Sequence, residues 1–204
     1  MIAIIDYGLG NLRSVLKAFE RIDEPAKLVT RPEDLQGASR IVLPGVGSFA
    51  AGMANLRSNG WIEPLNELAL ERGTPVLGIC LGMQLLTTHS EEGDADGLGW
   101  IPGQTRRIES ASTASALKVP HMGWNTLEFD TEHPVLRGVT PADRFYFVHS
   151  YCVTADDASN MLTSSTYGRR FNSGIVRGNI IGFQFHPEKS HASGLSLLKN
   201  FARL

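Results

Sequence analysis

The stretch from residue 74 to residue 86 constrains the fold more than any other part of the chain. Residues 76–79 follow a proline and are nearly all apolar, which is typical of a buried strand, and apolar residues recur at helical spacing from Met83 onwards. Cys80 stands between these segments, with Gly78 and Gly82 two residues to either side. A side chain on either flank would clash with the backbone of a sharp strand-to-helix turn. The sequence therefore predicts such a turn with Cys80 at its apex.

A cysteine at this position is a candidate nucleophile. The turn is expected to hold Cys80 in a strained, exposed position at the top of a sheet, where the next helix begins. Free N–H groups at a helix N-terminus stabilise a thiolate and a nearby oxyanion. The alternative interpretation is a buried cysteine in a turn flanked by glycines.

A nucleophilic thiol needs a base and a group that orients the base, and residues 182–190 contain candidates for both. Residues i and i+2 of an extended segment point to the same face, and Pro187 favours extended geometry at His186. Glu188 is therefore expected to approach His186 and to fix its tautomer, leaving the other ring nitrogen for Cys80. His149 is a rival base, but it has no carboxylate nearby in the sequence.

These motifs resemble a known family. Gly78-x-Cys80-x-Gly82 with a distant His186-Pro187-Glu188 resembles the class I (triad) glutamine amidotransferase domain. Within that family, residues 44–49, 120–125 and 186–190 are similar to the glutaminase subunits of imidazole glycerol phosphate synthases, of histidine biosynthesis. The resemblance runs from residue 6 to the C-terminus. It implies a flavodoxin-like α/β fold and hydrolysis of glutamine through a cysteine thioester.

The glycine-rich loop Pro44-Gly45-Val46-Gly47 is a candidate oxyanion site. A loop at a strand end can point its backbone N–H groups into a crevice, and no Lys-Ser/Thr follows to make it a phosphate loop. We interpret the N–H of Val46 or Gly47, together with that of Leu81, as the oxyanion donors, each contributing roughly 2.7–4 kcal/mol to acyl transfer. The alternative interpretation is a simple turn without a catalytic role. The resemblance implies that a peptide of this loop reorients before it donates.

Free glutamine carries an ammonium and a carboxylate, and a binding site must pair both. The resemblance assigns Gln84 and Glu92 to the α-amino-acid end of the substrate. It assigns Ser150 and Tyr151 to a carboxylate cradle formed partly by backbone. For Glu92 the alternative is an exposed charge with no role.

The resemblance also implies an obligate partner, the cyclase subunit, which uses the ammonia to make imidazole glycerol phosphate and an aminoimidazole carboxamide ribonucleotide. Nothing in the chain resembles the (β/α)₈ barrel of such a partner. Asn11, Trp124 and Lys189 are the candidate interface residues, and an exposed tryptophan suits an interface hot spot. Asn11 is also a candidate helix cap, and the alternative for Trp124 is packing in a local core.

The rest of the pattern predicts the fold class. Short apolar runs alternate with helical periodicity up to residue 86, which favours a mostly parallel central sheet flanked by helices. Residues ~100–185 predict hairpins and a meander, hence an antiparallel extension, with a loop at residues 110–116. At 204 residues and 42% hydrophobic, residues 1–204 are expected to form a single glutamine amidotransferase domain.

Composition excludes several classes of protein. A net charge of −2 gives no electrostatic case for nucleic acid, and no apolar run approaches the ~20 residues of a membrane helix. The apolar N-terminus lacks a basic region and a cleavage site, so it predicts a first strand and not a signal peptide. Two cysteines make no disulfide framework, and Cys152 is expected to be a buried small hydrophobe. No metal-ligand spacing is found, and the mechanism needs no cofactor. A reduced Cys80 favours the cytoplasm.

Two alternatives to the histidine-pathway glutaminase remain at this level. One is a paralogous amidotransferase for another synthase, such as one for anthranilate, aminodeoxychorismate or a surface sugar. Met83 argues against the first two, whose members usually carry histidine there, and so does the segment 120–125. The other is a catalytically inactive regulatory subunit, against which stand Cys80, His186 and Glu188.

Overall fold

The computed structural model describes residues 1–109 and 117–204, so the predicted loop at 110–116 lies outside the described residues. Five parallel strands form the centre of the sheet, in the order β2-β1-β3-β4-β13. They are β1 (Ile2–Ile5), β2 (Ala26–Val29), β3 (Arg40–Gly45), β4 (Val76–Cys80) and β13 (Ile180–Phe183). The central strands β1, β4 and β13 are buried along their whole length, which explains their continuous apolar runs.

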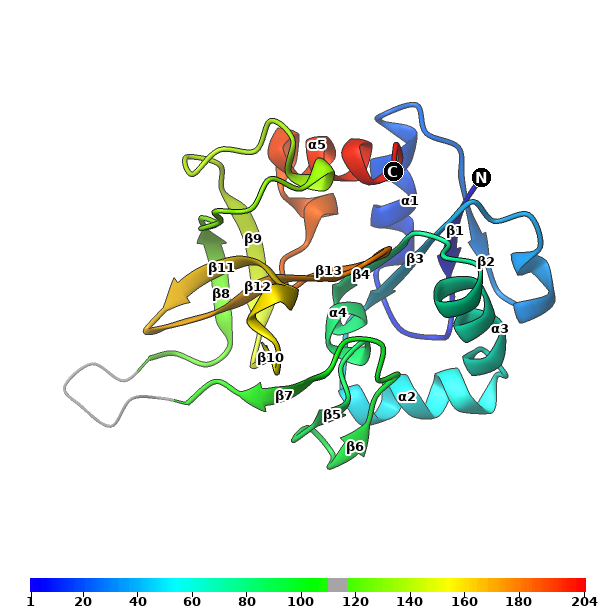
Figure 1. The fold of residues 1–204 in the computed structure, drawn as a ribbon, viewed down its shortest axis with the longest axis horizontal. Helices are drawn as coiled ribbons and strands as arrows, with labels where there is room; N and C mark the ends of the chain where they lie inside the picture. The colour runs from blue at the N-terminus through cyan, green and yellow to red at the C-terminus, as the bar shows by residue number, and fades with distance from the viewer. Residues whose placement is uncertain (110–116) are drawn as a thin grey trace.

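Helices cover both faces of this parallel region (Figure 1). On one face, α1 (Leu12–Glu20) and α5 (His191–Phe201) pack on alternate strand residues such as Ile2 and Ile4. On the other face, α2 (Phe49–Ser58), α3 (Ile62–Asn66) and the short α4 (Leu81–Leu85) pack on Ala3 and Ile5. The period-two alternation of each strand thus divides the core into two layers.

An antiparallel region extends the sheet beyond β13, as the figure shows on the left (Figure 1). It contains β12 (Arg169–Arg177), β11 (Met161–Tyr167), β10 (Tyr151–Ala155), β7 (Gly103–Arg107), β5 (His89–Ser90) and β6 (Ala95–Asp96). Only the short β5–β7 pair within it is parallel, among the residues described. A separate two-stranded sheet pairs β8 (His121–Asn125) with β9 (Phe145–His149). The predicted fold class is confirmed.

The helix that follows Cys80 is short. It is α4, which begins at Leu81 and ends at Leu85. There the N–H groups of Leu86 and Thr87 bond to carbonyls three residues back, and the Thr87 hydroxyl donates to the Gln84 carbonyl over 2.8 Å. This tightened turn frees the chain to enter β5.

The predicted helix cap at Asn11 is not formed by its side chain, which makes no capping hydrogen bond. The Asn11 backbone carbonyl accepts the N–H groups of Ser14 and Val15 in the first turn of α1. A π-helix at Glu67–Glu71 follows α3 directly. Short 3₁₀ turns lie at Pro32–Leu35, Pro134–Leu136, Ala158–Asn160 and Pro187–Lys189. Among the described residues, no helix has both the length and the apolar character needed to cross a lipid bilayer.

Candidate active site

The turn at Cys80 has the strained geometry that its flanking glycines predict. Cys80 has φ 56° and ψ −107°, a backbone conformation that residues other than glycine rarely adopt. A Cβ on Gly82 would overlap the Leu43 carbonyl oxygen, and one on Gly78 would lie 2.8 Å from the Gly82 backbone. The spacing of the glycines is therefore a steric requirement. The thiol is less exposed than expected, since Cys80 is only 7% accessible.

The order of the strands explains why distant segments meet at Cys80. Cys80 ends β4, and its register partner on β3 is Gly45 of the glycine-rich loop. On the other side of β4, β13 ends at Phe183, three residues before His186. Carboxyl ends of parallel strands lie at one edge of a sheet, where ligands of such folds bind. The turn, the loop and His186 therefore gather at this edge.

His186 and Glu188 are in direct contact. His186 Nδ1 lies 2.8 Å from Glu188 Oε1, and both side chains are buried, at 2% and 1% exposure. A carboxylate accepts, so Nδ1 carries a hydrogen, and in the neutral ring Nε2 keeps the lone pair. Nε2 makes no hydrogen bond with the residues that the structure describes. This is the geometry of an oriented base with one nitrogen free.

The charges around His186 favour its protonated form beside Cys80. Burial lowers the pKa of His186, but the neighbouring Cys80 and Glu188 outweigh burial and raise the pKa from 6.5 to about 9. When two groups of opposite charge lie close together in a buried site, each stabilises the ionised form of the other. The Cys80–His186 pair is thus suited to exist as thiolate and imidazolium.

Cys80 lines a cavity of about 390 Å³, and the residues predicted for the oxyanion and substrate sites line the same cavity. Its lining residues are Val46, Gly47, Cys80, Leu81, Gln84, Glu92, Pro120, Val148, His149, Ser150 and Tyr151. The volume lies within the range of small-molecule sites. Residues from positions 46 to 151 thus meet around one thiol, and His186 and Glu188 are buried beside it.

Two of the predicted substrate residues have defined partners. Gln84 is buried, and its Nε2 donates to the Tyr151 carbonyl over 3.1 Å and to Gln184 Oε1 over 3.2 Å. Glu92 is half-buried, and its Oε2 accepts the Phe49 N–H over 2.8 Å at the start of α2. A carboxylate at a helix N-terminus is stabilised there, so Glu92 is not a free surface charge.

Gln184 was not singled out in the sequence, yet it touches the thiol. Its Nε2 lies 3.8 Å from Cys80 Sγ, and the thiol itself donates a long hydrogen bond to the Val148 carbonyl, 3.9 Å away. The period-two argument that directs Glu188 toward His186 would also have placed Gln184 on the same face as His186. That pattern was available in the sequence.

His149 is occupied in a buried pair and is not available as the base. Its Nδ1 donates to the Tyr151 carbonyl, 2.8 Å away, so in the neutral ring its Nε2 accepts from His121 Nδ1, 2.9 Å away. Burial lowers the pKa of His149 to about 3 and that of His121 to about 4. Both rings are neutral at pH 7, and His186 has no competitor here.

The His121–His149 pair is expected to destabilise the protein in mild acid. Both folded-state pKa values lie below the ordinary value of 6.5. Below that pH the unfolded chain binds protons that the folded chain does not, so stability falls as the pH drops from 6.5 toward 4. We expect a loss of roughly 2–4 kcal/mol between pH 7 and pH 5, measured by urea unfolding.

The matched variant is His149→Gln, which should show about half of that pH-dependent loss. His186 does not reverse this fall in stability with decreasing pH. Its pKa is raised in the folded protein, so its stabilising contribution is already nearly complete below the unfolded value of 6.5. Equal unfolding free energies of the unmodified protein at the two pH values would contradict the assignment of two neutral, buried rings.

Two of the three predicted interface residues lie in one aromatic group. Trp124 is 45% exposed and stacks on His191, with ring centroids 5.1 Å apart. Lys189 Nζ lies 5.8 Å from the ring centroid of Tyr146, whose ring also contacts Trp124. Asn11 is exposed at the start of α1, which packs against the 3₁₀ turn that contains Lys189.

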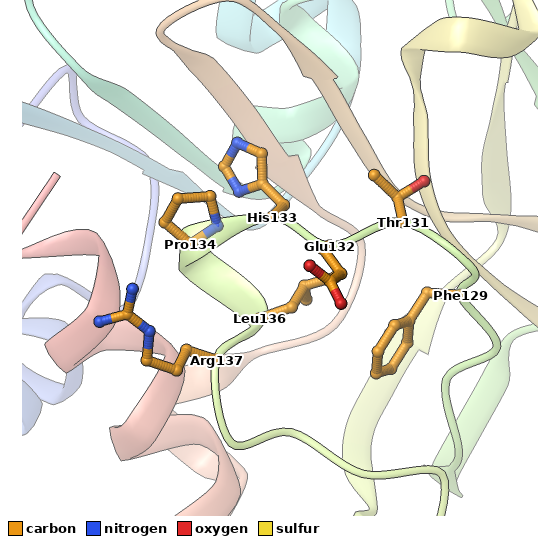
Figure 2. A pocket seen from close by; sticks show the side chains of 7 residues that line it. All are labelled: Phe129, Thr131, Glu132, His133, Pro134, Leu136 and Arg137. Carbon is orange, nitrogen blue, oxygen red and sulfur yellow. The ribbon is translucent and has the colours of Figure 1, made fainter.

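A second cavity, of about 370 Å³, lies elsewhere on the molecule (Figure 2). Its lining residues are Phe129, Thr131, Glu132, His133, Pro134, Leu136 and Arg137. His133 Nδ1 accepts the Val135 N–H, which uses that ring nitrogen to begin a 3₁₀ turn. These residues include no cysteine, and the strained thiol lines the other cavity.

Comparison with known proteins identifies the family of the chain. The family model "Glutamine amidotransferase class-I" matches residues 3–204. The "Imidazole glycerol phosphate synthase subunit HisH 2" of Pseudomonas aeruginosa is 47% identical over 204 residues, covering 100% of both chains. The subunit HisH of Moorella thermoacetica is 46% identical over 204 residues, covering 100% of this chain and 94% of its own.

Among solved structures, one titled "Structure of PurLQS from Thermotoga maritima" has a TM-score of 0.77 at 19% identity, covering 99% of this chain and 97% of that chain. At that identity the likeness shows the fold alone. The family match spans nearly the whole chain, and the curated relatives match it from end to end. The chain therefore belongs to the class I glutamine amidotransferase family, in the group that its HisH relatives represent.

Proposed function

We propose that this chain is the glutaminase subunit of an imidazole glycerol phosphate synthase. It hydrolyses L-glutamine to glutamate and ammonia and passes the ammonia to a cyclase subunit. The observation that carries the proposal is the strained Cys80 beside the buried His186–Glu188 pair, at a cavity lined by the predicted substrate residues. The HisH relatives, which match the chain from end to end, support its assignment to this synthase. Residues 1–204 act as one amidotransferase domain.

The proposed reaction proceeds through a thioester. The Cys80 thiol passes its proton to His186 Nε2, and the thiolate attacks the side-chain amide carbon of glutamine. The C–N bond then breaks, and the imidazolium returns the proton to the leaving nitrogen, which departs as ammonia. Water, deprotonated by His186, cleaves the thioester, releases glutamate and restores the thiol. Glu188 holds the ring through Nδ1 throughout.

The cavity supplies the other requirements of the reaction. The tetrahedral intermediate carries an oxyanion, for which the backbone N–H groups of Leu81 and of Val46 or Gly47 are the proposed donors. Gln84 and Glu92 bind the α-amino-acid end of glutamine, with the Ser150–Tyr151 segment at its carboxylate. Because the reaction depends on a reduced Cys80, we place the protein in the cytoplasm.

The cyclase is proposed to dock on the face that carries Trp124, Lys189 and Asn11. Trp124 is half exposed and held flat against His191, so its ring is available without a large entropy loss. Trp124→Ala is expected to weaken the complex about 10- to 100-fold, measured by titration calorimetry against the cyclase subunit. Leu70→Ala, at an exposed apolar residue on the π-helix, is the matched control. Unchanged affinity of the Trp124 variant would remove that residue from the interface.

The proposed function is tested by glutamate release under three conditions. The chain is assayed alone, with the cyclase subunit, and with that subunit plus its nucleotide substrate. Low activity alone and a large increase in the complete mixture support a glutaminase that serves this cyclase. Glutamine hydrolysis without any increase would keep the chemistry and assign the chain to another synthase. No hydrolysis in any mixture would contradict the proposed function.

A further inference from the structure

We propose that Gln184 is a positioning residue for the nucleophile: its side-chain amide donates a hydrogen bond to Cys80 Sγ and links the thiolate to Gln84 at the substrate end of the cavity. The proposal deepens the proposed glutaminase function and rests on it. Gln184 Nε2 lies 3.8 Å from Cys80 Sγ, a contact that the triad itself does not require.

Gln184 is held rigidly. Its side chain is completely buried, and its backbone N–H donates to the Ser173 carbonyl over 2.9 Å. It lies one residue beyond the end of β13 and two residues before His186. The same short segment therefore presents the base and the amide to one sulfur atom. An amide buried at this depth needs partners for both its oxygen and its nitrogen.

The hydrogen bonds fix which end of the amide faces the sulfur. A backbone carbonyl can only accept, so the Tyr151 carbonyl takes a hydrogen from Gln84 Nε2, 3.1 Å away. The same nitrogen lies 3.2 Å from Gln184 Oε1 and donates to it. With its oxygen engaged by Gln84, Gln184 presents its N–H₂ group to Cys80. The orientation is thus set by a chain of donors that starts at a backbone group.

A donor at this place favours the thiolate over the thiol. A hydrogen bond to an ionised acceptor is roughly twice as strong as one between neutral groups. The titratable groups that act on Cys80 from the packed elements are His186, which favours the thiolate as imidazolium, and Tyr7. The Tyr7 hydroxyl is buried and makes no hydrogen bond with the described residues. Gln184 adds a neutral N–H donor to the sulfur beside the charged ring of His186.

The test follows the alkylation of Cys80 by iodoacetamide as a function of pH, quantified on the Cys80 peptide by mass spectrometry. Gln184→Met keeps the volume and removes the donor, so the midpoint of the alkylation profile should move up by about one pH unit. Gln184→Glu places an acceptor-only, negative group there and should move it further. Gln84→Met, which frees the amide to rotate, should give a smaller shift in the same direction.

The matched control is Gln104→Met, a half-buried glutamine on β7 that does not line the cavity. It should leave the alkylation profile unchanged. Thermal unfolding of every variant separates a local effect from loss of folding, and Gln184→Glu decides the question if Gln184→Met does not fold. Superimposable profiles for the unmodified chain and a folded Gln184 variant would overturn the proposal, even if that variant melts at a lower temperature.

Glutamate release by the unmodified chain with its cyclase subunit is measured in parallel. Release together with unshifted alkylation profiles refutes the role of Gln184 alone. Absence of release contradicts the proposed function itself, and with it this inference.

Discussion

Replacing Cys80 with alanine is expected to abolish glutamine hydrolysis in the presence of the cyclase subunit, with a loss of at least roughly 10⁴-fold in kcat. Cys80 supplies the only protein atom that bonds to the substrate carbon in the proposed reaction, and no neighbouring hydroxyl or thiol among the cavity-lining residues has His186 as its base. The loss is read from glutamate release at saturating glutamine. The remaining activity should come from binding and oxyanion stabilisation alone.

Cys152→Ala is the matched control for this substitution. Burial raises the pKa of Cys152 to about 12, so this thiol is a poor nucleophile at neutral pH, and the variant should keep activity within about twofold. Affinity for the cyclase should be unchanged in both variants, because neither residue belongs to the exposed group around Trp124. A Cys80→Ala chain that still releases glutamate at more than a hundredth of the unmodified rate would refute the nucleophile.

Replacing His186 with asparagine is expected to lower kcat about 10³- to 10⁴-fold. Asparagine has no group that takes up a proton, so the thiol loses its base and the leaving nitrogen loses its acid. The same change should shift the alkylation midpoint of Cys80 upward, because the imidazolium no longer favours the thiolate. Both effects are measured on the complex, by glutamate release and by iodoacetamide.

His186→Asn also leaves Glu188 buried with a weaker partner, so its thermal stability must be compared. His133→Asn is the control, since it removes a partly buried histidine that lines the second cavity (Figure 2) and does not line the cavity at Cys80. That variant should retain activity. Comparable loss of activity in the two variants would mean that His186 acts through folding and not as the base.

The parts of the site that depend on residues close in sequence were predictable. The glycines around Cys80 reflect a clash with the local backbone, and the contact of Glu188 with His186 follows from the alternation of side chains in an extended segment. Gln184 obeys that same alternation, so it was accessible to the same argument. The mostly parallel sheet followed from the alternation of strand and helix periodicity, and the resemblance supplied the residues that line the cavity.

Other features depend on contacts that no local pattern contains. The short length of α4 reflects the Thr87 hydroxyl and the pairing of β5 with β7, a strand that begins at Gly103. The neutral state of His149 depends on His121 and the Tyr151 carbonyl, and the burial of the Cys80 thiol depends on the Val148 carbonyl and Gln184. These contacts join strands whose order in the sheet must be known first.

The most direct measurement is acid-quenched mass spectrometry of the complex during turnover with isotope-labelled glutamine. A glutamyl group should be found on the Cys80 peptide as a thioester that hydroxylamine removes. It should be absent from Cys80→Ala and should accumulate if hydrolysis is slowed. Steady release of glutamate with no label on Cys80, or with the label on another residue, would contradict the proposal that Cys80 is the nucleophile.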